Sequence, residues 1–344
     1  MSAAEFLPPR LIRGPHLQSL LGSSGLRAWA LGQRRRWLED SARALIVEAG
    51  DGVRLSGFLN LPAAQAPSGL AVLLHGWEGS ARSLYLVDAA SVLLSAGWAV
   101  FRLEFRDHGD SHHLNPELFH SCRLAEVVGA FRWIAASYPW RPLVAVGFSL
   151  GGNFALRVAL RAPEAGIPLA SVQAICPVID PAHGLAAIER APWFYERYFL
   201  TKWRASLKRK RERFPELYRF SDRALRKGLR ELTAWLVREY TDFPSLDAYL
   251  EGYSVAGSRL LDLEVPTQII TSADDPIIPV EDFLALRLGK HTRLRILPHG
   301  GHCAFLADFA LRSFAPRAIA EALDAVRRRG PDPEAPLAEN GSRG

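Results

Sequence analysis

The sequence predicts an α/β fold with a mostly parallel central sheet, helices on both faces and a helical cap inserted into the core. Short apolar runs of strand length alternate with stretches of helical periodicity, which is typical of a parallel sheet covered on both sides. An antiparallel hairpin precedes this alternation, and between residues 177 and 265 the alternation stops. A chain of 344 residues is long enough for one large domain with such an insertion.

The hairpin is the first element of the predicted core. Residues 44–47 and 53–59 are rich in apolar side chains and flank Asp51 and Gly52, a pair that favours a tight turn. The uninterrupted apolar run 70–74 then predicts a short buried strand. These segments open the sheet.

The alternation continues on both sides of the insertion. A helical pattern at residues 83–96 ends at Gly97, which favours a helix stop. By the same criteria the chain continues as a strand at 98–105, a helix at 118–137, a strand at 143–146, a helix at 149–161 and a strand at 169–176. Beyond the insertion we expect a strand at 266–271, a helix at 280–288, a strand at 294–297 and a closing helix that reaches residue 329.

Four regions follow from this pattern. Residues 1–42 are an N-terminal extension, residues 43–176 and 266–329 form the core, residues 177–265 are the helical cap or lid, and residues 330–344 are a disordered tail. An insertion at that point lies over the carboxyl ends of the strands, where a lid closes a site. The tail is rich in proline, glycine and charge, a composition that cannot bury a core.

A sharp strand-to-helix turn carries the candidate nucleophile, Ser149. From residue 147 the sequence reads Gly-Phe-Ser-Leu-Gly-Gly. A nucleophile on such a turn sits in strained backbone, and only residues without bulky side chains fit beside it. The first N–H groups of the following helix favour an oxyanion there. The alternative is an ordinary turn that contains a serine.

Candidate partners follow Ser149 in the order acid and then histidine. Asp275 stands just after a β-branched run, and His302 stands after a later apolar run. A serine needs a base to become a good nucleophile, and the base needs an acid to orient it. We therefore expect His302 to be the base and Asp275 to be the orienting acid.

Two neighbouring side chains are alternatives for these roles. Asp274 is the alternative acid. We prefer Asp275, because Pro276 directly follows it and stiffens the turn that aims the carboxylate. His299 is the alternative base. We prefer His302, because the two glycines that precede it allow the backbone to approach the serine closely.

An oxyanion hole needs two N–H donors aimed at the developing charge. The backbone N–H of Leu150, directly after the nucleophile, is one candidate. The loop 75–80, which reads His-Gly-Trp-Glu-Gly-Ser, supplies the other through the N–H of Trp77, because its glycines let it fold over the serine. The alternative is an ordinary glycine turn.

No cofactor and no metal is expected. The loop 106–113 is dense in histidine and aspartate, but its ligands are crowded without the i,i+4 spacing of a hydrolytic zinc motif, which favours a structural turn. Cys122, Cys176 and Cys303 lie far apart at no zinc-like spacing, which indicates a reducing compartment without a disulfide framework. Cys303, next to His302, is interpreted as a small filler behind the imidazole.

The net charge of +6 is moderate for this length, and no nucleic-acid partner is expected. The segment 202–213 is strongly basic with interleaved apolar residues. A solvated helix face is one interpretation, and peripheral contact with an anionic membrane surface is the other. The N-terminus lacks a signal-peptide pattern and no long apolar stretch occurs, so a cytoplasmic location is expected.

With these residues the chain resembles the α/β-hydrolases, and within them the YheT-like branch. The resemblance is carried by residues 13–21, 75–80, 105–111, 147–153, 273–279 and 299–302. It implies an α/β-hydrolase fold and a serine esterase or lipase-like hydrolase of acyl esters, relatives of which cleave acylglycerols and phospholipids.

We therefore expect hydrolysis of carboxylic esters with small to medium acyl chains, or of lipid esters, through an acyl-enzyme and a Ser-Asp-His triad. The alternatives are a thioesterase or an acyltransferase that uses the same triad. A non-catalytic lipid- or membrane-binding protein that uses the basic segment is a further alternative.

Overall fold

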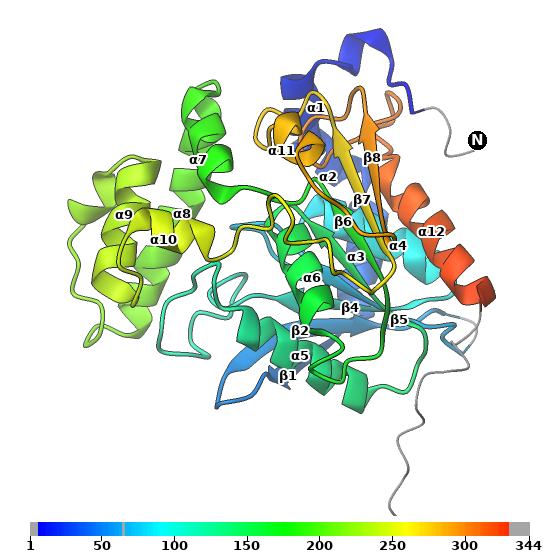
Figure 1. The fold of residues 1–344 in the computed structure, drawn as a ribbon, viewed down its shortest axis with the longest axis horizontal. Coiled ribbons are helices and arrows are strands. Elements are labelled where there is room, and N and C mark those ends of the chain that lie inside the picture. The colour runs from blue at the N-terminus through cyan, green and yellow to red at the C-terminus, as the bar shows by residue number, and fades with distance from the viewer. Residues whose placement is uncertain (1–5, 64–65, 330–344) are drawn as a thin grey trace, which may run out of the picture.

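The computed structural model describes residues 6–63 and 66–329, and the predicted tail 330–344 lies outside them. An eight-stranded sheet forms its centre (Figure 1). The strands are β1 (Arg43–Glu48), β2 (Arg54–Asn60), β3 (Leu70–Leu74), β4 (Ala99–Glu104), β5 (Leu143–Phe148), β6 (Leu169–Ile175), β7 (Thr267–Ser272) and β8 (Thr292–Leu297).

The strand order across the sheet is β1-β2-β4-β3-β5-β6-β7-β8. β2 pairs antiparallel with β1 and with β4, and every other pair of neighbours is parallel. The prediction of an antiparallel start followed by a parallel sheet is therefore confirmed. β3, β4 and β5 are buried along their whole length, and the sequences of β3 and β5 are therefore apolar rather than alternating, whereas β4 also buries Arg102 and Glu104.

Helices cover both faces of the sheet, as predicted (Figure 1). α5 (Leu124–Ser137) and α6 (Leu150–Arg161) pack on one face. α4 (Leu84–Ser95) and α12 (Ala315–Arg329) pack on the other and contact each other. Each face has its own apolar cluster, so the sheet lies between two cores.

The helix predicted at residues 118–137 begins only with α5, and the prediction is wrong for its first turns. Side chains from elsewhere take the backbone N–H groups there. Phe119 N–H donates to the carboxylate of Asp107 over 2.9 Å, and Ser121 N–H donates to the hydroxyl of Tyr249 over 3.1 Å. These contacts hold an irregular segment, and periodicity alone does not show them.

The helix predicted at residues 280–288 is also shorter, because α11 spans only Val280–Leu284. Beyond it the backbone pairs with another loop, since Arg287 N–H donates to the carbonyl of Gly257 over 2.9 Å. The other predicted strands and helices of the core are present, with ends that differ by a few residues.

The first forty residues contain helices that the sequence analysis did not predict. They are η1 (Arg10–Ile12), α1 (Pro15–Gly22), α2 (Gly25–Ala30) and α3 (Gly32–Asp40). A buried ion pair of 3.0 Å between Arg27 and Asp88 ties α2 to α4. This region is therefore packed onto the core.

A group of helices lies between β6 and β7 in the chain and gathers at one side of the molecule, on the left of Figure 1. We call them the inserted helices. They are α7 (Pro181–Arg190), α8 (Phe194–Arg213), η2 (Ala224–Arg226), α9 (Leu229–Tyr240) and α10 (Leu246–Glu251).

One buried ion pair joins the inserted helices to the core. The ammonium of Lys210 on α8 lies 2.6 Å from the carboxylate of Asp107 and 2.6 Å from the carbonyl of Asn115. The two side chains are 0% and 5% exposed. Because both charges are buried, removing either side chain leaves the other charge buried and unpaired, which destabilises the fold.

Replacing Lys210 by methionine is expected to lower the free energy of unfolding by about 3–5 kcal/mol, because it leaves a buried carboxylate unpaired. Urea unfolding followed by circular dichroism measures the change. Lys208→Met is the matched control, since Lys208 is on the same helix with its side chain 46% exposed. The control should keep the wild-type midpoint, and an equal midpoint for Lys210→Met contradicts the role of the pair.

Candidate active site

The turn between β5 and α6 holds Ser149 in the left-handed backbone region, at φ +53°. Glycine is needed on both sides of it. A Cβ on Gly147 would lie 2.2 Å from the carbonyl oxygen of Gly151, and a Cβ on Gly151 would lie 2.3 Å from that of Leu74. The Ser149 N–H donates to the carbonyl of Ile175 over 2.9 Å. The turn is therefore fixed between β3, β5 and β6.

Three side chains that are distant in sequence form one hydrogen-bonded chain. Ser149 Oγ lies 2.9 Å from His302 Nε2, and His302 Nδ1 lies 2.8 Å from Asp275 Oδ2. The other carboxylate oxygen of Asp275 accepts the N–H groups of Ile277 at 2.8 Å and Ile278 at 3.0 Å. The Asp275 side chain is fully buried and that of His302 is 12% exposed. The turn after β7 thus aims the carboxylate at the imidazole.

The alternative acid and base pair with each other instead. Asp274 Oδ1 accepts the N–H of Gly301 over 3.0 Å, and Asp274 Oδ2 lies 3.3 Å from His299 Nδ1. Asp274 therefore braces the backbone just before His302. The preferred residues, and not these two, lie in line with the serine.

The surroundings of His302 favour its protonated form. Burial is the largest single influence and lowers the pKa of His302, but the charges and hydrogen bonds of Asp275 and Cys303 together outweigh it, so the pKa of His302 is raised well above 6.5. An imidazolium formed at this position is therefore stabilised by Asp275.

Trp77 and Leu150, the residues whose N–H groups are the predicted oxyanion donors, line the same cavity as Ser149. Within residues 6–63 and 66–329, the backbone N–H groups of Trp77 and Leu150 donate to no protein acceptor. Free N–H groups next to a nucleophile are what an oxyanion requires.

Two buried histidines hold the loop that carries Trp77. His75 Nδ1–H donates to the carbonyl of Gly76 over 2.7 Å, and His75 Nε2 accepts from the N–H of Phe105 over 3.2 Å. His108 Nε2 accepts from the N–H of Glu78 over 3.1 Å. Burial lowers the pKa of His75 well below 6.5 and that of His108 to about 4, so both stay neutral and can accept. His108 therefore has a structural role at the rim of the site.

α1 also braces the loop that carries His302, through contacts that no pattern in the sequence indicates. Ser19 Oγ accepts the backbone N–H of His302 over 2.9 Å. The fully buried Gln18 accepts the N–H of Leu306 over 2.7 Å and donates to the carbonyl of Leu306 over 3.1 Å. The Pro-His-Leu-Gln-Ser run that carries part of the resemblance thus holds the histidine loop in place.

Ser149 lies between two spaces of different character. A cavity of about 120 Å³, which we call the apolar cavity, is enclosed mainly by hydrophobic side chains, many of them from the inserted helices. Its lining includes Leu185, Ile188, Phe199, Trp203, Leu236 and Ile278. A second space of about 770 Å³, the large cleft, is lined by both Ser149 and His302 and by charged side chains. Trp77 and Ser149 line both spaces.

The basic segment 202–213 lies on α8 beside the large cleft. Lys202 and Arg209 line the cleft and donate to the carbonyls of Glu78 over 3.3 Å and Gly109 over 3.2 Å. Burial raises the pKa of the Glu78 carboxyl to about 8. Lys202 and Arg209 therefore place positive charge at the wall of the large cleft.

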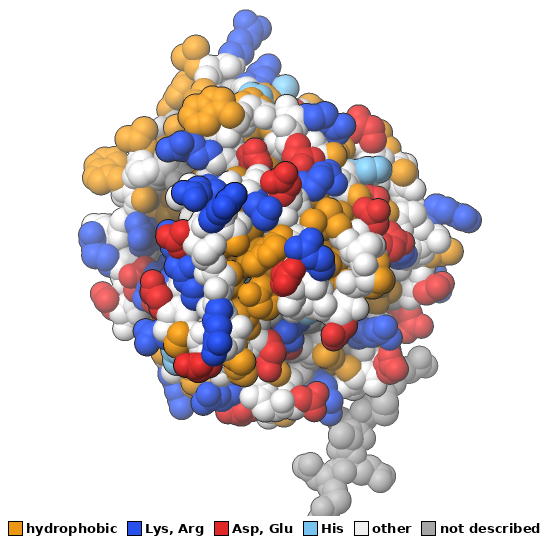
Figure 2. All heavy atoms as spheres, turned by 90° about the vertical axis from the view of Figure 1, so that its left-hand side faces the viewer, with side chains coloured by type: hydrophobic (Ala, Val, Ile, Leu, Met, Phe, Trp, Pro, Cys, Tyr) orange, Lys and Arg blue, Asp and Glu red, His pale blue; other side chains and the backbone are white. Residues whose placement is uncertain are grey.

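The face formed by the inserted helices is not uniformly basic. Figure 2 shows Lys and Arg side chains interspersed with Asp and Glu around a hollow lined by hydrophobic side chains. Contact of this face with an anionic membrane stays a prediction. None of the helices in the described ranges combines the length and apolar character needed to cross a membrane.

Comparisons with known proteins agree with this architecture. Residues 71–309 match a family described as alpha/beta hydrolase fold. The chain is 27% identical over 326 residues to the putative esterase YheT of Escherichia coli, covering 90% of this chain and 89% of that protein. It is 28% identical to human protein ABHD15, covering 94% of this chain and 69% of that one. An esterase structure from Pyrobaculum calidifontis shares the fold with a TM-score of 0.57 and 16% identity, covering 93% of this chain and all of the other.

Proposed function

The chain belongs to the α/β hydrolase fold family and is similar to a putative esterase, and from that premise we propose that it hydrolyses carboxylic esters through an acyl-enzyme. The observation that carries the proposal is the hydrogen-bonded chain from Ser149 through His302 to Asp275. Family membership and the esterase relative support hydrolase activity in general. The site residues support the ester chemistry.

In the first half-reaction, Ser149 Oγ attacks the ester carbonyl carbon while His302 Nε2 takes the hydroxyl proton. The negative oxygen of the tetrahedral intermediate accepts the N–H groups of Trp77 and Leu150. The imidazolium is stabilised by Asp275 and gives its proton to the leaving alcohol oxygen as the C–O bond breaks. An acyl group then remains on Ser149.

In the second half-reaction a water molecule takes the place of the alcohol. His302 removes a proton from this water, the hydroxide adds to the acyl carbon, and Ser149 leaves with the proton that His302 returns. The carboxylic acid is released and the free enzyme is restored. No cofactor takes part in these steps.

The two spaces beside Ser149 fit the two halves of an ester. The apolar cavity matches an acyl chain of small to medium length, and the large cleft, which also contains His302, matches the alcohol side that receives the proton. Because the inserted helices supply much of the cavity wall, we propose that residues 177–265 act as a cap that selects the acyl group.

Gly184 on α7 offers a test of the acyl assignment. A Cβ added there meets Ile278 Cδ1 at 3.8 Å and the carbonyl of Ile277 at 3.9 Å, which are ordinary contact distances, so the backbone at this position accepts a side chain. Gly184→Leu is expected to lower kcat/KM for p-nitrophenyl octanoate about tenfold or more relative to the acetate, because it fills the apolar cavity.

Gly184→Ala is the matched control, since it makes the same helix change with little added volume, and it should keep the wild-type ratio. Steady-state kinetics on the acetate, butanoate and octanoate esters measure the effect. An equal loss on all three esters contradicts the placement of the acyl chain. A wild-type protein that cleaves none of them while it cleaves acyl thioesters contradicts the proposed ester specificity.

A further inference from the structure

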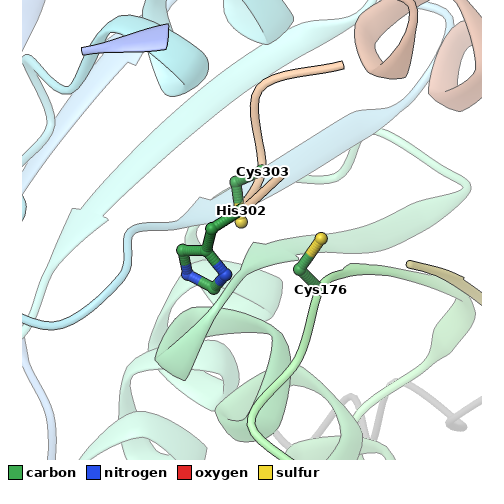
Figure 3. A group of neighbouring side chains, drawn as sticks. All are labelled: Cys176, His302 and Cys303. Carbon is green, nitrogen blue, oxygen red and sulfur yellow. The ribbon is translucent and has the colours of Figure 1, made fainter. Parts of the chain in front are cut away.

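Two cysteines lie beside the imidazole of His302, although they are distant from each other in sequence. The sulfur atoms of Cys176 and Cys303 and a ring nitrogen of His302 all lie within 4.8 Å of one another. Figure 3 shows both sulfurs on one side of the imidazole. We propose that these three side chains form a binding site for Zn²⁺, and that the bound ion inhibits the enzyme. The inhibition rests on the proposed function, because it requires His302 to be the base.

The backbone holds both thiols in place at the site. Cys176 directly follows β6 and Cys303 directly follows the proposed base, and their φ angles are +43° and +61°. Non-glycine residues rarely adopt this left-handed region. The N–H of Cys176 donates to the carbonyl of Ile270 over 2.8 Å, which anchors it to β7. The thiols are thus brought together by parallel strand ends and a loop rather than by local spacing.

Two sulfurs and one imidazole nitrogen are a ligand set that Zn²⁺ favours, with a fourth position left for water. Zinc holds sulfur at about 2.3 Å and nitrogen at about 2.0 Å in tetrahedral geometry, so the ligand atoms of a filled site lie about 3.5–3.8 Å apart. The distances between the ligand atoms, which are at most 4.8 Å, therefore need to shorten by about 1.0–1.3 Å at most. Binding releases the thiol protons, and two thiolates then neutralise the charge of the ion.

An ion can reach the site from the large cleft. His302 and Cys303 both line that cleft, whereas Cys176 is fully buried behind them. The buried carboxylate of Asp275, which lies 2.8 Å from the same imidazole, adds negative charge next to the site. A cation that enters the cleft therefore meets two of its ligands first and its third ligand just beneath them.

A zinc ion on the imidazole prevents His302 from acting as proposed. The coordinated nitrogen no longer exchanges protons, and the ring turns from its bonds to Ser149 and Asp275. Occupancy and ester hydrolysis are therefore mutually exclusive, and a chelator restores activity by removing the ion.

Binding is tested with Co²⁺ as a spectroscopic substitute for Zn²⁺, read by thiolate-to-cobalt absorption and by competition with Zn²⁺. Wild type, Ser149→Ala and Cys122→Ser should all show the absorption. Cys176→Ser and Cys303→Ser should weaken metal binding roughly tenfold or more. Thermal unfolding confirms that each variant folds, and having two cysteine variants keeps the test valid if one of them does not.

Zn²⁺ titration of ester hydrolysis tests the inhibition. Wild type should lose activity reversibly with one ion bound per chain, and Cys176→Ser should need about tenfold more Zn²⁺. Absence of the absorption, or equal sensitivity of wild type and both folded cysteine variants, overturns the proposal. The Ser149→Ala protein separates the two ideas, because its metal site should persist. If that variant still hydrolyses esters, the proposed function fails while the metal site stands.

Discussion

Replacing Ser149 by alanine is expected to lower kcat for p-nitrophenyl butanoate by a factor of about 10⁶. The variant loses the only atom placed to attack the carbonyl in the proposed mechanism, and it keeps the oxyanion donors and both spaces. A residual rate of about 10³–10⁴ over the uncatalysed reaction is expected from those remaining parts. Initial rates at saturating ester measure the loss.

The matched control is Ser95→Ala. Ser95 lies at the end of α4, and its hydroxyl donates to the backbone carbonyl of Ser91 over 2.9 Å. This variant should keep the wild-type rate. If Ser149→Ala also kept the wild-type rate, the serine would not be the nucleophile and the proposed mechanism would be wrong.

Asp275→Asn is expected to lower kcat by about 10⁴ while the shape of the site is kept. An amide at this position can donate to His302 Nδ1, which leaves the proton on Nε2, the atom that must receive the proton of Ser149. Loss of the carboxylate also removes the charge that raises the pKa of His302. The acidic limb of the kcat/KM profile should therefore move to lower pH.

Asp274→Asn is the matched control, because the two aspartates are adjacent in the same turn. The oxygen that accepts the N–H of Gly301 over 3.0 Å is retained in asparagine. If this hydrogen bond is weakened by about 1 kcal/mol, kcat should fall by less than about tenfold. A larger loss in Asp274→Asn than in Asp275→Asn would reverse the assignment of the acid.

The sequence predicts the parts of the site that depend on local pattern. The elbow is one, because a serine between close-packed glycines leaves a signature of a few residues, and the parallel sheet is another. The choice between Asp274 and Asp275 is different, because both stand on the same turn. The N–H groups of Ile277 and Ile278 bind one carboxylate oxygen of Asp275 and so turn this side chain, rather than that of Asp274, toward His302.

Contacts between distant segments could not be predicted in the same way. The start of α5 is set by side chains that bind the N–H groups of Phe119 and Ser121. The hydrogen bond from His302 N–H to Ser19 joins residues that are 283 positions apart in the sequence. The pairing of Cys176 with Cys303 follows from the position of β6 beside the histidine loop, and no spacing in the sequence announces it.

The most direct test of the central claim is covalent labelling of the protein with a fluorophosphonate, followed by mass spectrometry of its peptides. The reagent reacts rapidly with a serine that a neighbouring base activates and far more slowly with other serines. We expect one label, on Ser149, with much slower labelling in Asp275→Asn and none in Ser149→Ala. A label on another residue, or an unlabelled Ser149 in protein that hydrolyses esters, would contradict it.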